Sequence, residues 1–153
     1  MQVKNINFWL AALLALGIDQ GTKFWVVAKL PLGETVPLWP GVFHLTHVTN
    51  RGAAFSLFAE AGVNFLPWVS VGVSLVIALY ALLGPRLKPW EAVGYGLILG
   101  GAVGNGVDRV LTGAVVDFLD ARIIQFAVFN VADVAINLGV ACLLWASLRW
   151  EKT

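Results

Sequence analysis

Charge is scarce in this chain, and the little there is comes almost balanced between the two signs. Charged residues make up 12% of its 153 positions, and 10 basic and 9 acidic side chains leave a net charge of +1. A balance this close, with no basic cluster, excludes an extended nucleic-acid surface. The single cysteine, Cys142, excludes a disulfide within the chain and is interpreted as a small buried hydrophobe. No repeat, linker or low-complexity segment is visible, which predicts one domain over residues 1–153.

What the chain has in abundance is hydrophobic length. Hydrophobic residues make up 59% of the sequence, and the mean hydropathy of +0.81 lies outside the range of soluble domains. Roughly 20 apolar residues cross a bilayer as a helix. Four stretches of that kind predict an all-α membrane protein with spans near residues 6–28, 65–83, 90–111 and 129–148. The first stretch is too long and too polar near its end for a removable signal peptide, so we expect a retained span.

Four spans place both termini on the same side of the membrane. Basic residues concentrate at the termini and in the short loop between the second and third spans, and the positive-inside rule therefore places these segments in the cytoplasm. The residues on that side are Lys4, Arg86, Lys88, Arg149 and Lys152, while Lys29, Arg51 and Arg122 lie opposite, with Arg109 near the membrane edge. The sequence predicts a multi-pass protein with cytoplasmic termini.

The first outer loop, about residues 30–64, is too long for a simple connector and too apolar for disorder. Thr35–Thr49 is rich in β-branched and aromatic residues and is interrupted by prolines and a glycine, which predicts a small extracytoplasmic β-sheet. Asn50-Arg51-Gly52 predicts a turn. Ala53–Ala61 is apolar enough to form a short interfacial helix.

Two histidines in this loop, His44 and His47, raise the question of a metal site. They have no cysteine or carboxylate partner nearby in the sequence, and an odd spacing on a strand points them to opposite faces. We therefore expect solvated strand residues and no metal.

Acids are the most informative polar residues, because a carboxylate near hydrocarbon is costly and marks a functional site by default. Asp19, Asp108, Asp117 and Asp133 all lie within or at the edges of predicted spans. Asp19 and Lys23 are four residues apart on one helical face, where they can neutralise each other. A structural ion pair is the favoured interpretation of these two residues.

The third span combines small residues with polar ones. Glycines at every fourth position predict a face for close helix packing, and Asp108 continues that face. Asn105 and Arg109 follow on the neighbouring stripe. The cluster either orients a loop through an ionic contact between Asp108 and Arg109 or binds a ligand, and the sequence leaves both open. The packing glycines are Gly96, Gly100 and Gly104.

In the fourth span, Asn130, Asp133 and Asn137 share one helical face. The third and fourth spans form a hairpin, so Asp117 lies at the same membrane level as Asp133, although Asp120 is a rival for its place. Two carboxyls in a confined site share a proton. The ionised one can then deprotonate a water while the protonated one hydrogen-bonds a scissile carbonyl, which hydrolyses an amide without metal or cofactor.

Five strings of residues, in order and spread over nearly the whole chain, resemble the signal peptidase II family, the lipoprotein signal peptidases of bacteria. Each string alone is weak, but five in order on a four-span chain are specific. The strings are Asp19-Gln20-Gly21-Thr22-Lys23, Asn50-Arg51-Gly52-Ala53-Ala54-Phe55, the glycine-rich segment from Gly100 to Arg109, Val116-Asp117-Phe118 and Phe129-Asn130-Val131-Ala132-Asp133.

The resemblance implies an aspartyl endopeptidase of the bacterial inner membrane, with its active site near the outer face. Its partners would be membrane lipid and prolipoproteins that carry diacylglycerol on a cysteine, cut just before that cysteine, and the chain is expected to act as a monomer. The catalytic positions fall on Asp117 and Asp133, which favours Asp117 over Asp120. Asp19 and Lys23 match a structural or substrate-supporting pair. Positions that line or support the site fall on Asn50, Gly52, Asn105, Asp108, Arg109, Asn130 and Ala132.

The segment Asp120–Ala127 departs from the family pattern. It lacks the Trp and Pro that often precede the Phe-Asn motif, which predicts a shorter loop and leaves its contacts with substrate open. The aspartate pair is not affected.

Three other functions compete with this interpretation. A small transporter or proton relay would also place acids in membrane helices, but here the acids cluster at one face. A serine peptidase would use Lys23 as the base for Ser56, Ser70 or Ser74. A non-catalytic assembly factor predicts that Asp117→Asn and Asp133→Asn leave function intact.

Overall fold

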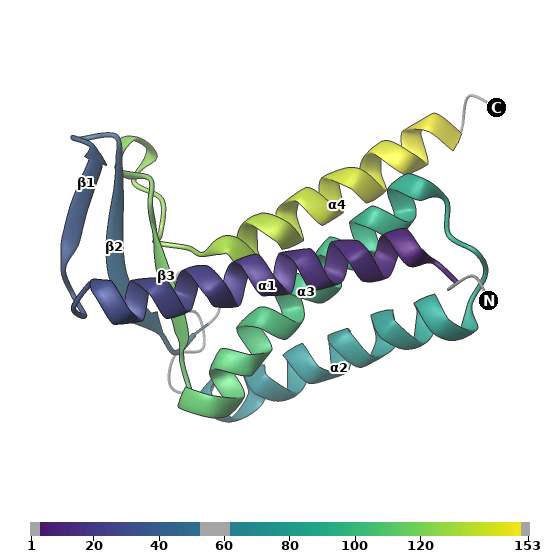
Figure 1. Cartoon of the computed structure of the whole chain (residues 1–153), viewed down its shortest axis with the longest axis horizontal. Helices are drawn as coiled ribbons and strands as arrows, with labels where there is room; N and C mark the ends of the chain where they lie inside the picture. The colour runs from purple at the N-terminus through teal and green to yellow at the C-terminus, as the bar shows by residue number, and fades with distance from the viewer. Residues whose placement is uncertain (1–3, 53–61, 151–153) are drawn as a thin grey trace.

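The computed structural model describes residues 4–52 and 62–150. Long helices lie side by side, and a small sheet crosses one end of them (Figure 1). Both termini and the connection between the second and third helices lie at the opposite end (Figure 1). The long helices are α1 (Ile6–Lys29), α2 (Gly62–Leu83), α3 (Pro89–Thr112) and α4 (Val131–Trp150).

The sheet has three antiparallel strands in the order β1-β2-β3. The first two, β1 (Thr35–Trp39) and β2 (Phe43–Asn50), confirm the sheet predicted in the first outer loop. The third, β3 (Val115–Asp120), was not predicted, because the sequence placed these residues only beyond a span. Pairing of β3 with β2 sets Val48 opposite Asp117 and so fixes the position of that acid in the sheet.

A short 3-10 helix, η2 (Arg122–Ile124), follows β3. An isolated bridge between Leu119 and Phe129 then closes the segment that returns to α4. The bridge ties the end of this loop back to β3, and the prediction of a loop shorter than that of the family stays a prediction.

The glycine face of α3 lets the other helices approach closely. Helix α3 packs against α1, α2 and α4. A methyl group at Gly100 would lie 2.5 Å from the carbonyl oxygen of Ala12 on α1, and one at Gly101 would lie 2.5 Å from that of Ala132 on α4. The predicted close-packing face is confirmed, and it places α3 at the centre of the bundle.

The bundle is that of an integral membrane protein. Among the described residues, three helices are long and apolar enough to cross a membrane, and these are Ile6–Lys29, Phe65–Leu83 and Val131–Arg149. Helix α3 does not meet this measure, because it carries glycines and charged residues that its neighbours enclose. The four predicted helices are therefore present, but the prediction that all four of them span the membrane is not confirmed.

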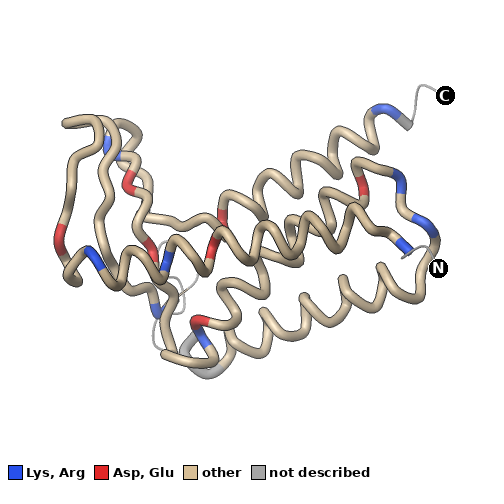
Figure 2. Tube along the Cα trace, in the orientation of Figure 1, with Lys and Arg blue, Asp and Glu red and all other residues tan. Residues whose placement is uncertain are grey.

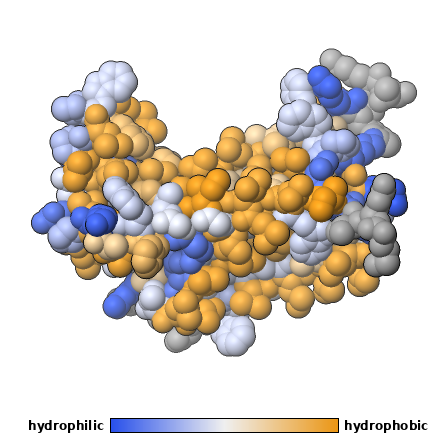
Figure 3. Space-filling view, viewed as in Figure 1, coloured by the Kyte–Doolittle hydropathy of each residue, from blue (hydrophilic) through white to orange (hydrophobic). Residues whose placement is uncertain are grey.

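Charge and hydropathy differ between the two ends of the helices and their middle. Lysines and arginines gather at the end with the termini, acids and bases meet near the sheet, and the middle of the helices is almost free of charge (Figure 2). The surface over the same middle region is largely apolar (Figure 3). Cys142, expected to be buried in α4, is half-buried.

The predicted solvation of the two histidines is wrong. The exposed fractions of His44 and His47 are only 8% and 6%. His47 donates from Nδ1 to the carbonyl of Leu30 at 2.7 Å, and His44 accepts the backbone N–H of Gly41 at 3.2 Å. Both side chains therefore fold back onto neighbouring loops. The predicted interfacial helix at Ala53–Ala61 lies outside the described residues.

Candidate active site

Asp117 and Asp133 meet where β3 and the first turn of α4 come together, and both line one pocket. Asn130 joins them: its Nδ2 donates to Asp117 Oδ1 at 2.7 Å, and its Oδ1 accepts the backbone N–H of Asp133 at 3.0 Å. In return, Asp133 Oδ2 accepts the backbone N–H of Asn130 at 3.1 Å. These reciprocal bonds form a capping box at the start of α4, so the helix terminus itself positions one carboxylate of the pair.

Two further asparagines supply the remaining hydrogen bonds to the two acids. Asn50 donates from Nδ2 to Asp117 Oδ2 at 3.1 Å, while its Oδ1 accepts the backbone N–H of Gly52 at 2.9 Å. The predicted turn is thereby confirmed. Asn105 donates from Nδ2 to Asp133 Oδ1 at 2.9 Å. Each carboxylate thus accepts hydrogen bonds on both of its oxygens.

A buried ion cluster lies on the α1 side of the two acids. Lys23 Nζ is 2.9 Å from both Asp19 Oδ2 and Asp108 Oδ2, and it donates to Asn105 Oδ1 at 2.9 Å. The predicted Asp19–Lys23 pair is confirmed. Asp108 pairs with Lys23 and not with Arg109, so the proposed contact between neighbours on α3 is replaced by one between helices.

The ion cluster also holds the two elements that bear the acids. Asp19 Oδ1 accepts the backbone N–H of Ala132 on α4 at 2.9 Å, and Asp108 Oδ2 accepts that of Val116 on β3 at 3.2 Å. Gln20 donates to both Asp19 and Asp108, at 3.1 and 3.0 Å. Gln20 was not predicted as a site residue, although a buried amide beside Asp19 in an apolar span was an available signal.

Arg109 has a different role from its neighbours on α3. It reaches toward Ser70 Oγ on α2 and the carbonyl oxygen of Gly52, both at 3.4 Å, and it lines the pocket. These contacts hold the turn after β2 against the bundle. Lys23, the base required by a serine peptidase, is enclosed by three acceptors and lies on the far side of Asn105 from the pocket, which disfavours that alternative.

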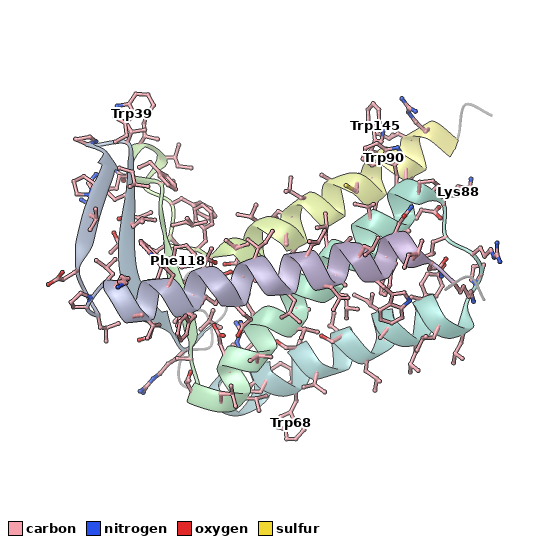
Figure 4. All side chains as sticks on the ribbon, in the orientation of Figure 1. Trp39, Trp68, Lys88, Trp90, Phe118 and Trp145 are labelled. Carbon is pink, nitrogen blue, oxygen red and sulfur yellow. The ribbon has the colours of Figure 1, made fainter. Side chains whose placement is uncertain are left out.

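The pocket has a volume of about 550 Å³, with a polar wall at the acids and an apolar wall elsewhere. The sheet and α4 diverge from their meeting place near Phe118, and Trp39 and Trp145 mark their far ends (Figure 4). Sequence reasoning missed the apolar wall, because nothing separates its residues from other hydrophobic ones. The apolar residues are Ala121, Ile124, Phe126, Val128, Phe129, Val134 and Leu138, among others.

The pKa values of the two acids on β3 are shifted in opposite directions. Burial raises the pKa of Asp117 to about 6; hydrogen bonds from Asn50 and Asn130 oppose the rise, and the nearby charge of Asp133 adds to it. Burial also acts on the pKa of Asp120, but hydrogen bonds from Thr46 and Arg122, at 2.6 and 2.9 Å, outweigh it and lower that pKa. Asp120 pairs across the sheet with His44 and does not line the pocket.

The structure thus brings the predicted site residues into one connected cluster. They are Asp19, Lys23, Asn50, Gly52, Asn105, Asp108, Arg109, Asp117, Asn130, Ala132 and Asp133.

The chain is similar to known proteins over nearly its whole length. The family described as signal peptidase (SPase) II matches residues 11–149. The lipoprotein signal peptidase of Gloeobacter violaceus is 62% identical over 99% of this chain and 87% of its own length. That of Trichormus variabilis is 59% identical over 97% of this chain and 94% of its own.

Solved structures share the fold as well. A bacterial membrane enzyme determined by the in meso method at 2.3 Å resolution superposes with a TM-score of 0.86, at 28% identity, over 97% of this chain and 93% of its own. A second, at 1.9 Å resolution, gives a TM-score of 0.83 at the same identity.

These similarities place the chain among membrane-embedded peptidases of the aspartic class. Within that class, the chain belongs to the signal peptidase II family.

Proposed function

We propose that this chain removes the signal peptide from diacylglyceryl-modified prolipoproteins, cutting just before the lipidated cysteine, with Asp117 and Asp133 as the catalytic pair. The observation that carries the assignment of the pair is Asn130, which bonds both acids at the wall of one pocket. Two carboxyls held this way can share one proton, which is the state that metal-free amide hydrolysis requires.

The chemistry follows from that shared proton. The ionised carboxylate takes a proton from a water, whose oxygen attacks the scissile carbonyl carbon. The protonated carboxyl hydrogen-bonds the carbonyl oxygen, on which negative charge develops. Collapse of the tetrahedral species breaks the C–N bond, and the departing amine takes up a proton from the pair. No covalent intermediate with the enzyme forms.

The two walls of the pocket suit a lipid-modified peptide. The apolar side, with Phe126, Val134 and Leu138, suits acyl chain and apolar side chains. The polar side holds Asn50 and Asn105, amides that can hydrogen-bond the backbone of a substrate helix that has unwound for cleavage. A substrate anchored in the bilayer can then enter laterally, between the sheet and α4.

The arrangement of charge supports a particular topology. We place α3 across the membrane as a fourth span, shielded by the other helices, with the site near the outer face of the bacterial inner membrane. Lysines and arginines gather at the end with the termini (Figure 2), and the positive-inside rule assigns that end to the cytoplasm. The chain would work as a single membrane domain and as a monomer.

The test is signal-peptide release by the purified protein in lipid. Wild type should cleave a diacylglyceryl-modified prolipoprotein and leave the unmodified precursor intact. Asp117→Asn and Asp133→Asn should each reduce the rate by about 10²–10⁴-fold, the usual contribution of general acid–base groups. Asp120→Asn is the matched control and should retain cleavage.

Each outcome has a distinct meaning. Cleavage that survives at both Asp117→Asn and Asp133→Asn, in folded protein, would exclude the pair and revive the assembly-factor alternative. Equal cleavage of modified and unmodified precursor would contradict the lipid requirement alone.

A further inference from the structure

The orientation of the Asn105 amide is fixed by the chemistry of its neighbour. A lysine ammonium has only donors, so the atom of Asn105 that faces Lys23 at 2.9 Å must be the carbonyl oxygen. Asn130 donates to the same oxygen at 2.9 Å. The NH₂ group of Asn105 must therefore face Asp133, where it donates at 2.9 Å. Lys23 does not contact Asp133 itself. By fixing the orientation of the Asn105 amide, it directs the NH₂ group of Asn105 toward Asp133.

Asp133 also accepts a hydrogen bond from the backbone. Its other oxygen accepts the backbone N–H of Asn130, the residue that caps α4. The position is the third of the helix, where unpaired N–H groups and the helix dipole favour negative charge. Hydrogen bonds therefore reach both oxygens of this carboxylate, and the carboxylate lies at the positive end of the helix dipole.

Asp117 lies in the opposite kind of environment. It lies on a strand, beside the start of α4 but not within the helix, and only 3% of its surface is exposed. Its donors are two neutral side-chain amides, from Asn50 and Asn130. Burial without a cation in direct contact favours the neutral form, and the pKa of Asp117 is accordingly raised to about 6.

We infer that the two acids enter the reaction in unequal and predetermined states: Asp133 as the ionised base that activates water, and Asp117 as the carrier of the proton. Lys23 is the positioning residue that sets this asymmetry, because it orients the amide of Asn105 toward Asp133. This inference rests on the proposed function, in which the same two residues form the catalytic pair.

Other charges around the pair do not remove the asymmetry. The charged groups that face Asp133 are Asp117 of β3, Arg109 and Asp108 of α3, and Lys23 with Asp19 of α1. Lys23 is paired directly with Asp19 and Asp108 and reaches Asp133 through the oriented amide of Asn105, and its charge also acts on Asp117. Arg109 influences both acids of the pair.

The protonation states can be read directly by infrared spectroscopy of full-length protein labelled with ¹³C at the aspartate carboxyls. In wild type, the carbonyl band of one protonated carboxyl should disappear as the pH rises through about 6. Asp117→Asn should remove that band. Asp133→Asn should keep it and shift its titration to lower pH, because the neighbouring negative charge is gone. A band that vanishes in Asp133→Asn and persists in Asp117→Asn would reverse the two roles and overturn the inference.

The positioning role is tested by the acid limb of the pH–rate profile for signal-peptide release. Asn105→Asp keeps the shape of the side chain and an acceptor for Lys23, but it replaces the donor facing Asp133 with an acceptor. The limb should move to higher pH by about one unit or more, since loss of a donor and a new negative neighbour both disfavour ionisation. Asn105→Leu should move it in the same direction by less.

Two further variants separate positioning from structure. Lys23→Arg keeps a donor-only group and should leave the limb in place. Gln20→Met disturbs the same ion cluster without touching Asn105 and should also leave it in place. A lower rate with an unmoved limb in folded Asn105→Asp would make Asn105 merely structural and overturn the role of Lys23.

Failure of the inference is distinguishable from failure of the proposed function. If Asp117→Asn and Asp133→Asn both cleave, the catalytic pair itself is wrong. If both are inactive and the infrared band belongs to Asp133, the pair stands and only the assignment of roles fails. The spectroscopic result does not depend on activity, so it decides even where Asn105→Asp does not fold.

Discussion

Asn130 and Asp133 hold each other by two hydrogen bonds that run in opposite directions, from the backbone N–H of each residue to the side chain of the other, at 3.1 and 3.0 Å. The same Asn130 side chain reaches Asp117 at 2.7 Å. One residue therefore begins α4, positions one acid and binds the second. The geometry of the pair is consequently tied to the integrity of a helix terminus, which is more rigid than a loop.

Removal of Asn130 should damage catalysis more than folding. Asn130→Ala removes an N-cap, whose loss costs about 0.5–2 kcal/mol, and it also removes the one residue, among those that the structure describes, that bonds both acids. We expect cleavage to fall by at least tenfold more than the change in unfolding midpoint would explain. Asn7→Ala, at an exposed position near the start of α1, is the control for stability. A loss of activity that simply follows the unfolded fraction would contradict the bridging role.

Lys23 should be among the most important residues for stability. In Lys23→Met, the buried Asp19 and Asp108 lose their cation, and an uncompensated buried charge costs about 3–5 kcal/mol. Arg122→Met is the matched comparison, because the Arg122 side chain is 44% exposed in its pair with Asp120 and such pairs contribute about 0–1 kcal/mol. Unfolding in detergent measures both. Similar losses would show that burial does not decide the strength of these pairs.

A methyl group at Gly101 should disturb the active site from a distance. It would lie 2.5 Å from the carbonyl oxygen of Ala132, the residue before Asp133, and so it would push the start of α4 outward. We expect Gly101→Ala to lose about 1–3 kcal/mol of stability through overpacking, and to lose cleavage as well. Gly17→Ala, with open space around it on α1, should instead gain about 0.5–1 kcal/mol. Equal cleavage by the two variants would contradict this account.

The stability of the protein should fall as the pH rises through the titration of Asp117. Its pKa is raised from 3.8 to about 6 in the folded protein, so the unfolded chain loses this proton first. The contribution to stability is complete below pH of about 4 and is lost by about pH 6, and it amounts to roughly 3 kcal/mol. Unfolding midpoints across this range should decline for wild type.

Two variants test the sign of that pH effect. Asp117→Asn cannot titrate, so its midpoint should decline less over the same range. Asp120→Asn removes an acid whose pKa is lowered, and its stabilisation is present above pH of about 4 and lost as the pH falls. The difference in unfolding midpoint between Asp120→Asn and wild type should therefore increase as the pH rises from low values. Equal changes in the midpoints of wild type and Asp117→Asn between pH 4 and 6 would mean that Asp117 ionises as easily folded as unfolded.

The long helices could be predicted well because hydrophobic length is a local property. The first span was expected at residues 6–28, and α1 runs from Ile6 to Lys29. The fourth was expected from residue 129, but α4 begins at Val131, because Asn130 is used as its cap. Strand β3 was missed, because six residues that read as a loop become a strand only by pairing with β2.

The sequence by itself determined the membrane character, the glycine face of α3 and the acids that matter, since each depends on residue type and spacing along the chain. Only the tertiary structure decided that Lys23 binds Asp108, that Asn130 bonds both acids and that Asp120 lies apart from them. The physical reason is the separation in sequence between the residues that interact. Asp19 meets the backbone of Ala132 across 113 positions of sequence, and burial, hydrogen-bond direction and the pKa of Asp117 all depend on such distant neighbours, which no local pattern specifies.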